Sequence, residues 1–403
     1  MDNAGSRWLA ASEPHTAPHA VDLRRARQPE VEIIAAAAYD LLLSLHVCVA
    51  SPELDYTDYD VGREWIVAAR AHCAERDAAA LRLLDRAFGG AVPGALHATL
   101  IALVALSPAP RDTADFLAWL DAVPVEQVME ALLDQEGLGD DWRKLLLSAL
   151  GRGRAAHEAR ARLVARYTQE TQATVSALLD DPDTARRDLV AALRVWDETV
   201  FAPERERVLP LLEREAAVLA RQRAEMPSER FIRLAMRGVE WERPAGFRKL
   251  IFAPSYFCRP AVYYHFWHGT LTFCLPVEAT ILEELQPVSD PRAPGMEILR
   301  YFEALGDSTR LRILRLLAER EMYLTELAER LGLTKATTKH HMVRLRAAGF
   351  VTLYDRDRMT FYALRPGIAR HAAQLINDYL RDTQTPSVVP AAPSQEPAQP
   401  PLA

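Results

Sequence analysis

The sequence lacks a long uncharged apolar run. Its best candidate, residues 31–50, is interrupted by Glu32, Asp40 and His46, whereas a membrane span needs about 20 mostly uncharged residues. The N-terminus also lacks a basic start followed by an apolar run and a small-residue cleavage site, so no secretory signal is visible. These absences predict a buried helix within residues 31–50, no membrane partner and a cytoplasmic protein.

Cysteines and enzyme motifs are also scarce. Four cysteines in 403 residues are too few and too scattered for a disulfide framework, which favours reduced thiols: Cys48, Cys73, Cys258 and Cys274. The chain has no G-x-x-x-x-G-K-[ST], G-x-G-x-x-G, H-E-x-x-H or G-x-S-x-G pattern. We therefore expect no enzymatic activity, no cofactor and no metal.

Length and composition predict several domains. A chain of 403 residues with 49% hydrophobic and 26% charged residues suggests two or three globular domains. The expected order is a loosely ordered N-terminus (1–29), a sensor or assembly domain (30–285), a linker (286–295), a compact domain (296–382) and a disordered proline-rich tail (383–403).

The sensor or assembly domain changes character along its length. Apolar spacing predicts helices up to about residue 230, at 64–88, 113–122, 125–134, 141–149, 156–179 and 183–199. Residues 247–277 are rich in aromatic and β-branched side chains, which is strand composition, and His268-Gly269 suits a hairpin turn. The predicted fold class is mainly α with a small β element (α+β).

Residues 296–382 carry the pattern of a winged helix-turn-helix. Apolar periodicity predicts helices over 297–306, 309–320, 326–331 and 335–348, with Asp307-Ser308, Thr325 and Thr334 as caps and Gly332 in a tight turn. Residues 350–354 and 360–364 read as strands that flank a tip with two arginines. This order predicts DNA binding.

The helix over 335–348 is the candidate reading helix. Thr338, Met342 and Leu345 share one face, and no acidic residue occurs from Thr334 through Tyr354. The side chains expected at base edges are Lys335, Thr337, Lys339 and His340. Those expected at phosphates are Thr334, His341, Arg344 and Arg346, with Arg356 and Arg358 on the wing. Residues 296–382 carry a net charge of +4 and the rest of the chain −11, which places positive charge where phosphate is expected.

The stretches FEALGDSTRLRILRLL, LTELAERLGLTKATTKHHMVRLRAAGFV and DRMTFYAL resemble ArsR-type winged-helix regulators. The resemblance covers about 85 residues. It implies a homodimer formed by the first and last helices of this domain, and therefore an inverted-repeat operator in double-stranded DNA. The matching interface positions are Ile298, Leu299, Phe302, Leu305, Ile368, Leu375, Ile376, Tyr379 and Leu380.

Two departures from the family pattern bear on function. Metal-sensing members often carry a cysteine pair in the helix before the turn, but EMYLTELAERL has neither cysteine nor histidine. Metal sensing through such a site is therefore not expected here. Thr338 occupies a position that is usually aliphatic, so looser packing beneath the reading helix is expected.

The strand-rich region resembles, more weakly, long-form ArsR regulators with an uncharacterised N-terminal domain. Its aromatic side chains form either a ligand pocket, with Tyr256, Tyr263, Phe266 and Trp267 as the candidates, or the core of a sheet. A two-residue turn would place Tyr263 opposite Cys274. A thiol switch between Cys258 and Cys274, and a metal site with His265 and His268, are weaker alternatives. The acidic run that ends at Asp60 is predicted to be a solvated loop.

The sequence thus predicts a homodimeric ArsR-like repressor whose DNA binding is modulated through the N-terminal domain, with a small-molecule effector of unknown identity. Two alternatives stay open. One is an enzyme fused to a DNA-binding domain, which would show paired titratable groups in a concave site. The other is an architectural or assembly factor without a ligand, which would show a filled core.

Overall fold

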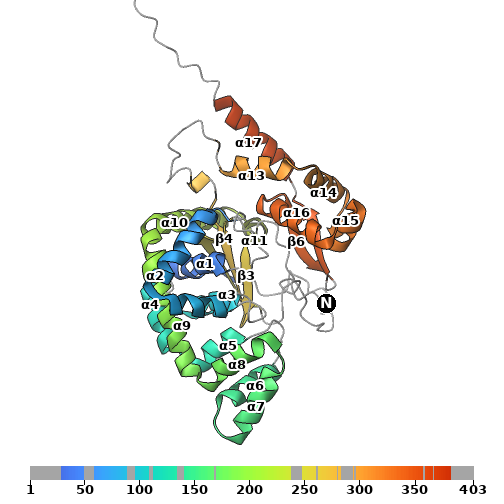
Figure 1. Cartoon of the computed structure of the whole chain (residues 1–403). Coiled ribbons are helices and arrows are strands. Elements are labelled where there is room, and N and C mark those ends of the chain that lie inside the picture. The colour runs from blue at the N-terminus through green and yellow to red at the C-terminus, as the bar shows by residue number, and fades with distance from the viewer. Residues whose placement is uncertain are drawn as a thin grey trace, which may run out of the picture.

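The computed structural model describes residues 29–49, 59–88, 96–108, 112–133, 140–167, 169–236, 247–259, 262–278, 280–282, 294, 296–356, 359–365 and 367–382. The fold is mainly helical with two small sheets (Figure 1), which confirms the predicted fold class. Residues 1–28, the proline-rich tail and nearly all of the predicted linker lie outside the described residues. In the described part of the chain, no helix is long and apolar enough to cross a membrane.

The larger sheet has the strand order β1-β2-β4-β3. Its strands are β1 (Glu30–Ile33), β2 (Lys249–Ser255), β3 (Tyr263–Trp267) and β4 (Thr270–Pro276). The predicted hairpin is present: β3 and β4 are antiparallel, Tyr263 pairs with Cys274, and both His268 and Gly269 have positive φ. The sequence analysis missed β1, which it placed in a helical region. This strand pairs in parallel with β2, which lies more than 200 residues away in the sequence. Short-range apolar periodicity cannot indicate a pairing over that separation.

The described chain between β1 and β2 forms helices. They are α1 (Ala37–Val49), α2 (Gly62–Phe88), α3 (Leu96–Leu106), α4 (Thr113–Ala122), α5 (Val125–Leu133), α6 (Asp140–Leu150), α7 (Arg154–Val164), α8 (Gln169–Asp180), α9 (Pro182–Trp196), the π-helical turn η3 (Asp197–Phe201), α10 (Ala202–Glu225) and α11 (Ser228–Ala235). The buried helix expected within residues 31–50 is α1, and all its residues are buried.

Two predicted helices differ from those observed. The helix predicted over 156–179 is two helices, α7 and α8, because α7 ends at Val164 and the chain turns through Tyr167, whose hydroxyl donates to the Leu133 carbonyl at 2.5 Å. Helix α2 is kinked at Asp77, where φ is −156° and ψ is 97°. The Asp77 carboxylate accepts from the backbone N–H groups of Ala79 and Ala80 at 2.8 and 3.0 Å. Asp77 therefore caps the second half of α2.

Each face of the larger sheet is covered by its own core. Ala253, Trp267 and Cys274 belong to a core shared with α1–α10, whose largest fully buried side chain is Trp196. Leu250, Phe252 and Phe273 belong to a second core with α11 and Leu219 of α10. Both faces are thus buried, which explains the nearly unbroken apolar composition of β2 and β4.

The C-terminal part, residues 296–382, has a core of its own and forms the upper right of Figure 1. Its elements are α13 (Met296–Leu305), α14 (Ser308–Glu319), β5 (Met322–Tyr323), α15 (Leu324–Leu331), α16 (Lys335–Ala347), β6 (Val351–Arg356), β7 (Met359–Leu364) and α17 (Ile368–Asp382). The three strands form an antiparallel sheet in the order β5-β7-β6. Helix α13 contacts α17.

Most local signals in this part were read correctly. Asp307 caps α14 by accepting the N–H of Arg310 at 2.9 Å, and Gly332 ends α15 with φ 68°. The Thr325 cap is wrong, because Tyr323 is the N-cap and α15 begins at Leu324. Strand β5 supplies the reason: its pairing with β7 brings an extended backbone up to Tyr323, and the helix starts directly after it.

Candidate nucleic-acid interface

The N-terminal end of α16 is fixed by a cap. The hydroxyl of Thr334 accepts the backbone N–H of Thr337 at 3.1 Å, as the sequence predicted. Because the capping hydroxyl satisfies an otherwise unpaired amide, the first turn of the helix is held in one conformation. This turn carries Lys335 and Thr337, two of the residues expected at base edges.

One face of α16 anchors the helix in the protein core. Met342 and Leu345 are buried in the core of the C-terminal part. Thr338 is fully buried as well, and its hydroxyl donates to the Thr334 carbonyl at 2.9 Å. This internal hydrogen bond lets a hydroxyl occupy a buried position without an unsatisfied polar group. The departure from an aliphatic residue at Thr338 is therefore compensated within the helix.

The opposite face of α16 is exposed and basic. The exposed side chains include four base-edge candidates and two phosphate candidates: Lys335, Thr337, Lys339, His340, Thr334 and Arg346. Arg344 is half-buried and its Nε donates to Nε2 of His340 at 3.3 Å. A helix that is buried on one side and presents cations on the other can enter the major groove of DNA, where donors meet base edges and charges meet phosphates.

His341 lies apart from the other predicted contacts. Its side chain is 14% exposed and its Nδ1 lies 3.8 Å from Oδ1 of Asp307, the N-cap of α14. Burial lowers the pKa of His341, while the negative charge of Asp307 acts in the opposite direction. Its phosphate contact stays a prediction, and the side chain thus lies between α16 and α14. The sequence could not show this, because position 341 is flanked by exposed positions on the helix.

The wing is formed by β6 and β7. Val351 pairs with Leu364 at its base and Arg356 pairs with Met359 at its tip. Arg356 is the last residue of β6, and Arg358 lies outside the described residues. The backbone therefore has the two-stranded hairpin that the sequence predicted after the reading helix.

The predicted dimer residues fall into three groups. Ile298 and Ile368 are buried in the protomer, and Leu305 and Leu375 pack against the same core. Ile376 and Tyr379 are partly buried. Leu299, Phe302 and Leu380 are 40%, 54% and 54% exposed, on α13 and α17. These three side chains are the exposed apolar members of the predicted interface.

The aromatic residues proposed as a ligand pocket do not share one side of the sheet. Tyr263 and Trp267 pack into the core on one face, together with Tyr256, whereas Phe266 packs against the core on the other face. The hydroxyl of Tyr263 is hydrogen-bonded to that of Tyr59 at 2.7 Å and to Nε2 of His46 at 3.0 Å. The guanidinium of Arg207 lies over the Tyr256 ring, 4.4 Å from its centre. These positions support the sheet-core alternative, and the pocket stays a prediction.

The thiol and metal alternatives gain no support. Cys258 and Cys274 are free and buried, and burial raises the pKa of the Cys274 thiol well above its ordinary value. A thiol of high pKa is a poor nucleophile. In the described part of the chain, no group of three or more His, Cys, Asp and Glu side chains is placed to hold a metal ion. His268 instead lies 3.1 Å from Glu130, at the end of the hairpin.

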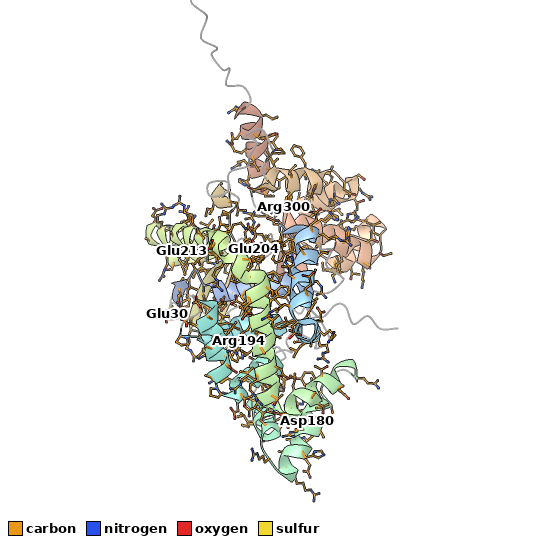
Figure 2. All side chains as sticks on the ribbon, turned by 60° about the vertical axis from the view of Figure 1, so that its left-hand side comes forward. Glu30, Asp180, Arg194, Glu204, Glu213 and Arg300 are labelled. Carbon is orange, nitrogen blue, oxygen red and sulfur yellow. The ribbon has the colours of Figure 1, made fainter. Side chains whose placement is uncertain are left out.

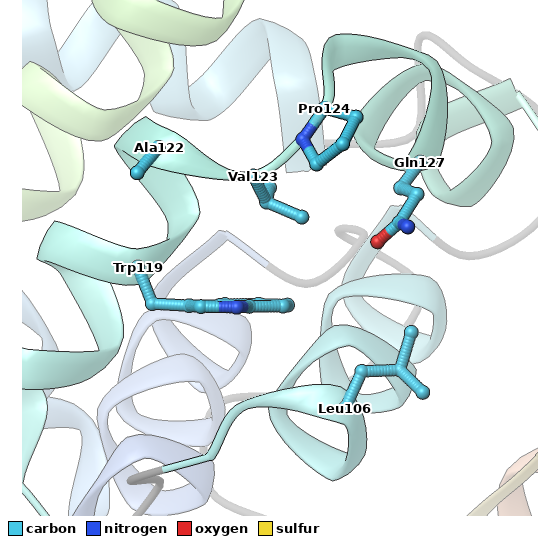
Figure 3. Close-up of a pocket in the computed structure, with 6 residues that line it drawn as sticks. All are labelled: Leu106, Trp119, Ala122, Val123, Pro124 and Gln127. Carbon is cyan, nitrogen blue, oxygen red and sulfur yellow. The ribbon is translucent and has the colours of Figure 1, made fainter.

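An open surface pocket of about 540 Å³ lies elsewhere in the N-terminal part, at the corner between α4 and α5. Figure 3 shows the Trp119 ring on one side of it, with Gln127 and Val123 pointing toward that ring. Leu106, Ala122 and Pro124 complete the lining. None of the four aromatic candidates borders this space.

A helix-turn-helix followed by a two-stranded wing, with an exposed basic reading helix, defines a winged-helix DNA-binding protein. Residues 307–352 match the family model of bacterial regulatory proteins of the arsR family. The chain is 37% identical over 101 residues to the HTH-type transcriptional regulator CmtR of Mycobacterium tuberculosis and to that of Mycobacterium bovis, and the match covers 25% of this chain and 86% of either relative. The HTH-type transcriptional regulator KmtR of M. tuberculosis is 35% identical over 81 residues, which are 20% of this chain and 60% of KmtR. The chain belongs to the ArsR family of DNA-binding transcriptional regulators.

Proposed function

We propose that this regulator is a repressor that binds an inverted-repeat operator as a homodimer, and that its N-terminal part modulates the binding. The single observation that supports DNA reading best is the exposed basic face of α16 on a capped and buried helix. We assign residues 296–382 as the DNA-binding domain and residues 30–285 as the sensor or assembly domain. Such a repressor acts in the cytoplasm, where its operator lies.

The proposed DNA contacts follow the exposed surface of α16. Lys335, Thr337, Lys339 and His340 face base edges, because they lie toward the N-terminal half of the helix. Thr334, Arg344 and Arg346, with the wing arginines Arg356 and Arg358, bind phosphates. We leave His341 out of the set because its side chain turns toward Asp307.

Selection of genomic DNA fragments by the full-length chain, at a stated salt concentration, tests the regulator function. An inverted repeat shared by the recovered fragments supports it. Binding that is blind to sequence and falls steeply with salt would instead favour an architectural factor, because phosphate contacts alone carry no sequence information.

The proposed homodimer uses Leu299 and Phe302 of α13 and Leu380 of α17. Two-fold pairing through these helices would place two copies of α16 on one side of a duplex, about 34 Å apart. Phe302→Glu should therefore give a monomer in analytical ultracentrifugation. Leu311→Glu is the matched control, because Leu311 is 50% exposed but lies on α14, outside the proposed interface. A dimer that survives Phe302→Glu unchanged would exclude this interface.

A sensing role of the N-terminal part is supported by its size and by the ion pair between Asp60 and Arg300 of α13. We propose that its effector is a small molecule. The relatives are HTH-type transcriptional regulators, and the family model matches residues 307–352 of this chain.

A further inference from the structure

The turn at Tyr59 and Asp60, between α1 and α2, is tied firmly to the N-terminal part. The Tyr59 hydroxyl is hydrogen-bonded to that of Tyr263 on β3, which also contacts His46 of α1. The backbone N–H of Asp60 donates to the Arg259 carbonyl at 3.2 Å, and Nε of Arg259 donates to Oδ2 of Asp60 at 2.8 Å. The turn is therefore connected directly to both β3 and α1.

The other carboxylate oxygen of Asp60 reaches the C-terminal part. Oδ1 of Asp60 forms an ion pair with Nη2 of Arg300, on α13. Figure 2 shows Arg300 at the junction between the two parts. The side chains of Asp60, Arg259 and Arg300 are 9%, 4% and 18% exposed. One buried carboxylate thus binds two guanidinium groups, one from each part.

Burial lowers the pKa of both arginines, that of Arg300 to about 10. Both therefore remain charged at neutral pH. Removal of one partner from a buried ion pair leaves an uncompensated charge, which costs more than the loss of an exposed pair. The sequence predicted that Asp60 lies in a solvated loop. Its two partners are about 200 and 240 residues away along the chain, and local sequence patterns cannot indicate contacts over such distances.

The same junction borders the reading helix and leaves the proposed dimer surface open. The charge of Arg346, on α16, acts on the hydroxyl of Tyr263 and opposes the rise in its pKa that burial causes. On α13, Leu299 and Phe302 remain exposed beside the bound Arg300. The N-terminal part can therefore hold α13 while α13 pairs with a second copy.

We propose that Asp60 is a latch between the two parts, and that movement of the Tyr59–Asp60 turn changes operator affinity by releasing Arg300 and with it α13. The regulatory half of this inference rests on the proposed function. The latch would connect an event in the N-terminal part to the dimerisation helix. Coupling of this kind requires that the effector bind the latched and released states unequally.

Hydrogen exchange on the full-length chain tests the latch without DNA. Arg300→Gln should make exchange in peptides covering residues 59–62 and 296–305 about tenfold faster, because the turn and α13 lose their shared restraint. Arg300→Lys, which keeps the charge, should have a smaller effect. Arg312→Gln is the matched control, since Arg312 is exposed on α14 and loses the same charge. Unchanged exchange in Arg300→Gln would overturn the latch.

Operator affinity then tests the coupling. Asp60→Asn and Arg300→Gln should each change the dissociation constant in the same direction, by about threefold or more, and the double variant should change it no further than the larger single effect. Independent effects that multiply in the double variant, or none beyond that of Arg312→Gln, would overturn the coupling. If the wild-type chain bound no operator at all, the exchange result would still stand, so the two failures are distinguishable.

Discussion

The reading helix α16 and strand β3 both carry histidines, but they place them in opposite environments. His340 of α16 is exposed beside Lys339, whereas His265 of β3 is 7% exposed and its Nε2 has no hydrogen-bond partner among the described residues. The exposed polar side chains of α16 are therefore available to DNA. His265 of β3 is enclosed, and it acts on the stability of the N-terminal part.

The same contrast holds for the two parts as a whole. The predicted DNA-binding surface of the C-terminal part depends on features that are local in the sequence: a cap, a glycine turn and a helix without acidic residues. The N-terminal part buries polar groups whose partners come from distant segments, such as Asp40 of α1, which accepts from Ser255 and from the N–H of Tyr256. The predictions below test whether core changes and surface changes separate in this way.

The largest effect is expected from Trp196→Ala. Trp196 is fully buried in the N-terminal core, and its indole N–H donates to the Ser44 hydroxyl at 3.0 Å. The cavity and the lost apolar contacts should lower the free energy of unfolding of this part by about 3–5 kcal/mol. Urea denaturation followed by circular dichroism measures it, with Trp196→Phe as the milder control. Equal destabilisation of the C-terminal part would show that the two cores are not separate.

Acid should weaken the N-terminal part. Burial lowers the pKa of His46 and of His265 to about 4. The unfolded chain therefore takes up protons first, and the stability present above pH 6.5 is lost as the pH falls toward 4. Asp40 acts in the opposite sense: burial raises its pKa to about 6, so its contribution is present at low pH and is lost as the pH rises through 6. Acidification removes the stability contributed by the two histidines and restores that contributed by the one aspartate. We therefore expect the free energy of unfolding of this part to fall by about 2 kcal/mol between about pH 7 and pH 5.

Urea denaturation at these two pH values measures the change in the free energy of unfolding of the N-terminal part. His265→Phe should reduce the loss by roughly the contribution of one histidine, and Asp40→Asn should enlarge it. The exposed His340 provides the matched control, because His340→Phe should leave this pH dependence unchanged. A stability that rose on acidification in the wild-type chain would contradict the assignment.

Lys339→Ala should weaken operator binding by about 1–2 kcal/mol, as expected for the loss of a base contact. The side chain is exposed on the reading face of α16, so the variant should keep its unfolding free energy. Fluorescence anisotropy on the operator and on random DNA of equal length measures both affinities. An equal loss on the two DNAs would reassign Lys339 to a phosphate contact.

The smallest effect is expected at the helix cap. Thr334→Ala removes the hydroxyl that accepts the N–H of Thr337, and it should cost the C-terminal part about 1 kcal/mol. Thr334→Ser keeps the hydroxyl and should retain most of the stability. Thermal unfolding distinguishes the two variants, and identical melting curves for Ala and Ser would show that the cap contributes nothing.

The sequence predicted the C-terminal part well because its signals are short-range. Asp307, Gly332 and Thr334 specify helix ends through contacts within three or four residues. The turn His268-Gly269 likewise specified the register of β3 and β4. These features depend on backbone chemistry that a few neighbouring residues determine.

Long-range pairing accounts for what the sequence did not reveal. Strand β1 is recognisable only through its parallel partner β2, and Asp60 gains its role only when Arg259 and Arg300 approach it. His341 is turned from the exposed face of α16, with its Nδ1 3.8 Å from Oδ1 of Asp307, the N-cap of α14. In each case the deciding contact joins segments that local periodicity treats separately.

Hydroxyl-radical footprinting of the full-length chain on a selected genomic fragment tests the central claim most directly. The account predicts two protected half-sites on one side of the duplex, about 10 base pairs from centre to centre and related by an inverted repeat. Lys339→Ala should weaken the protection of both half-sites together. Uniform protection along the fragment, without half-sites, would contradict a homodimer that reads sequence through α16.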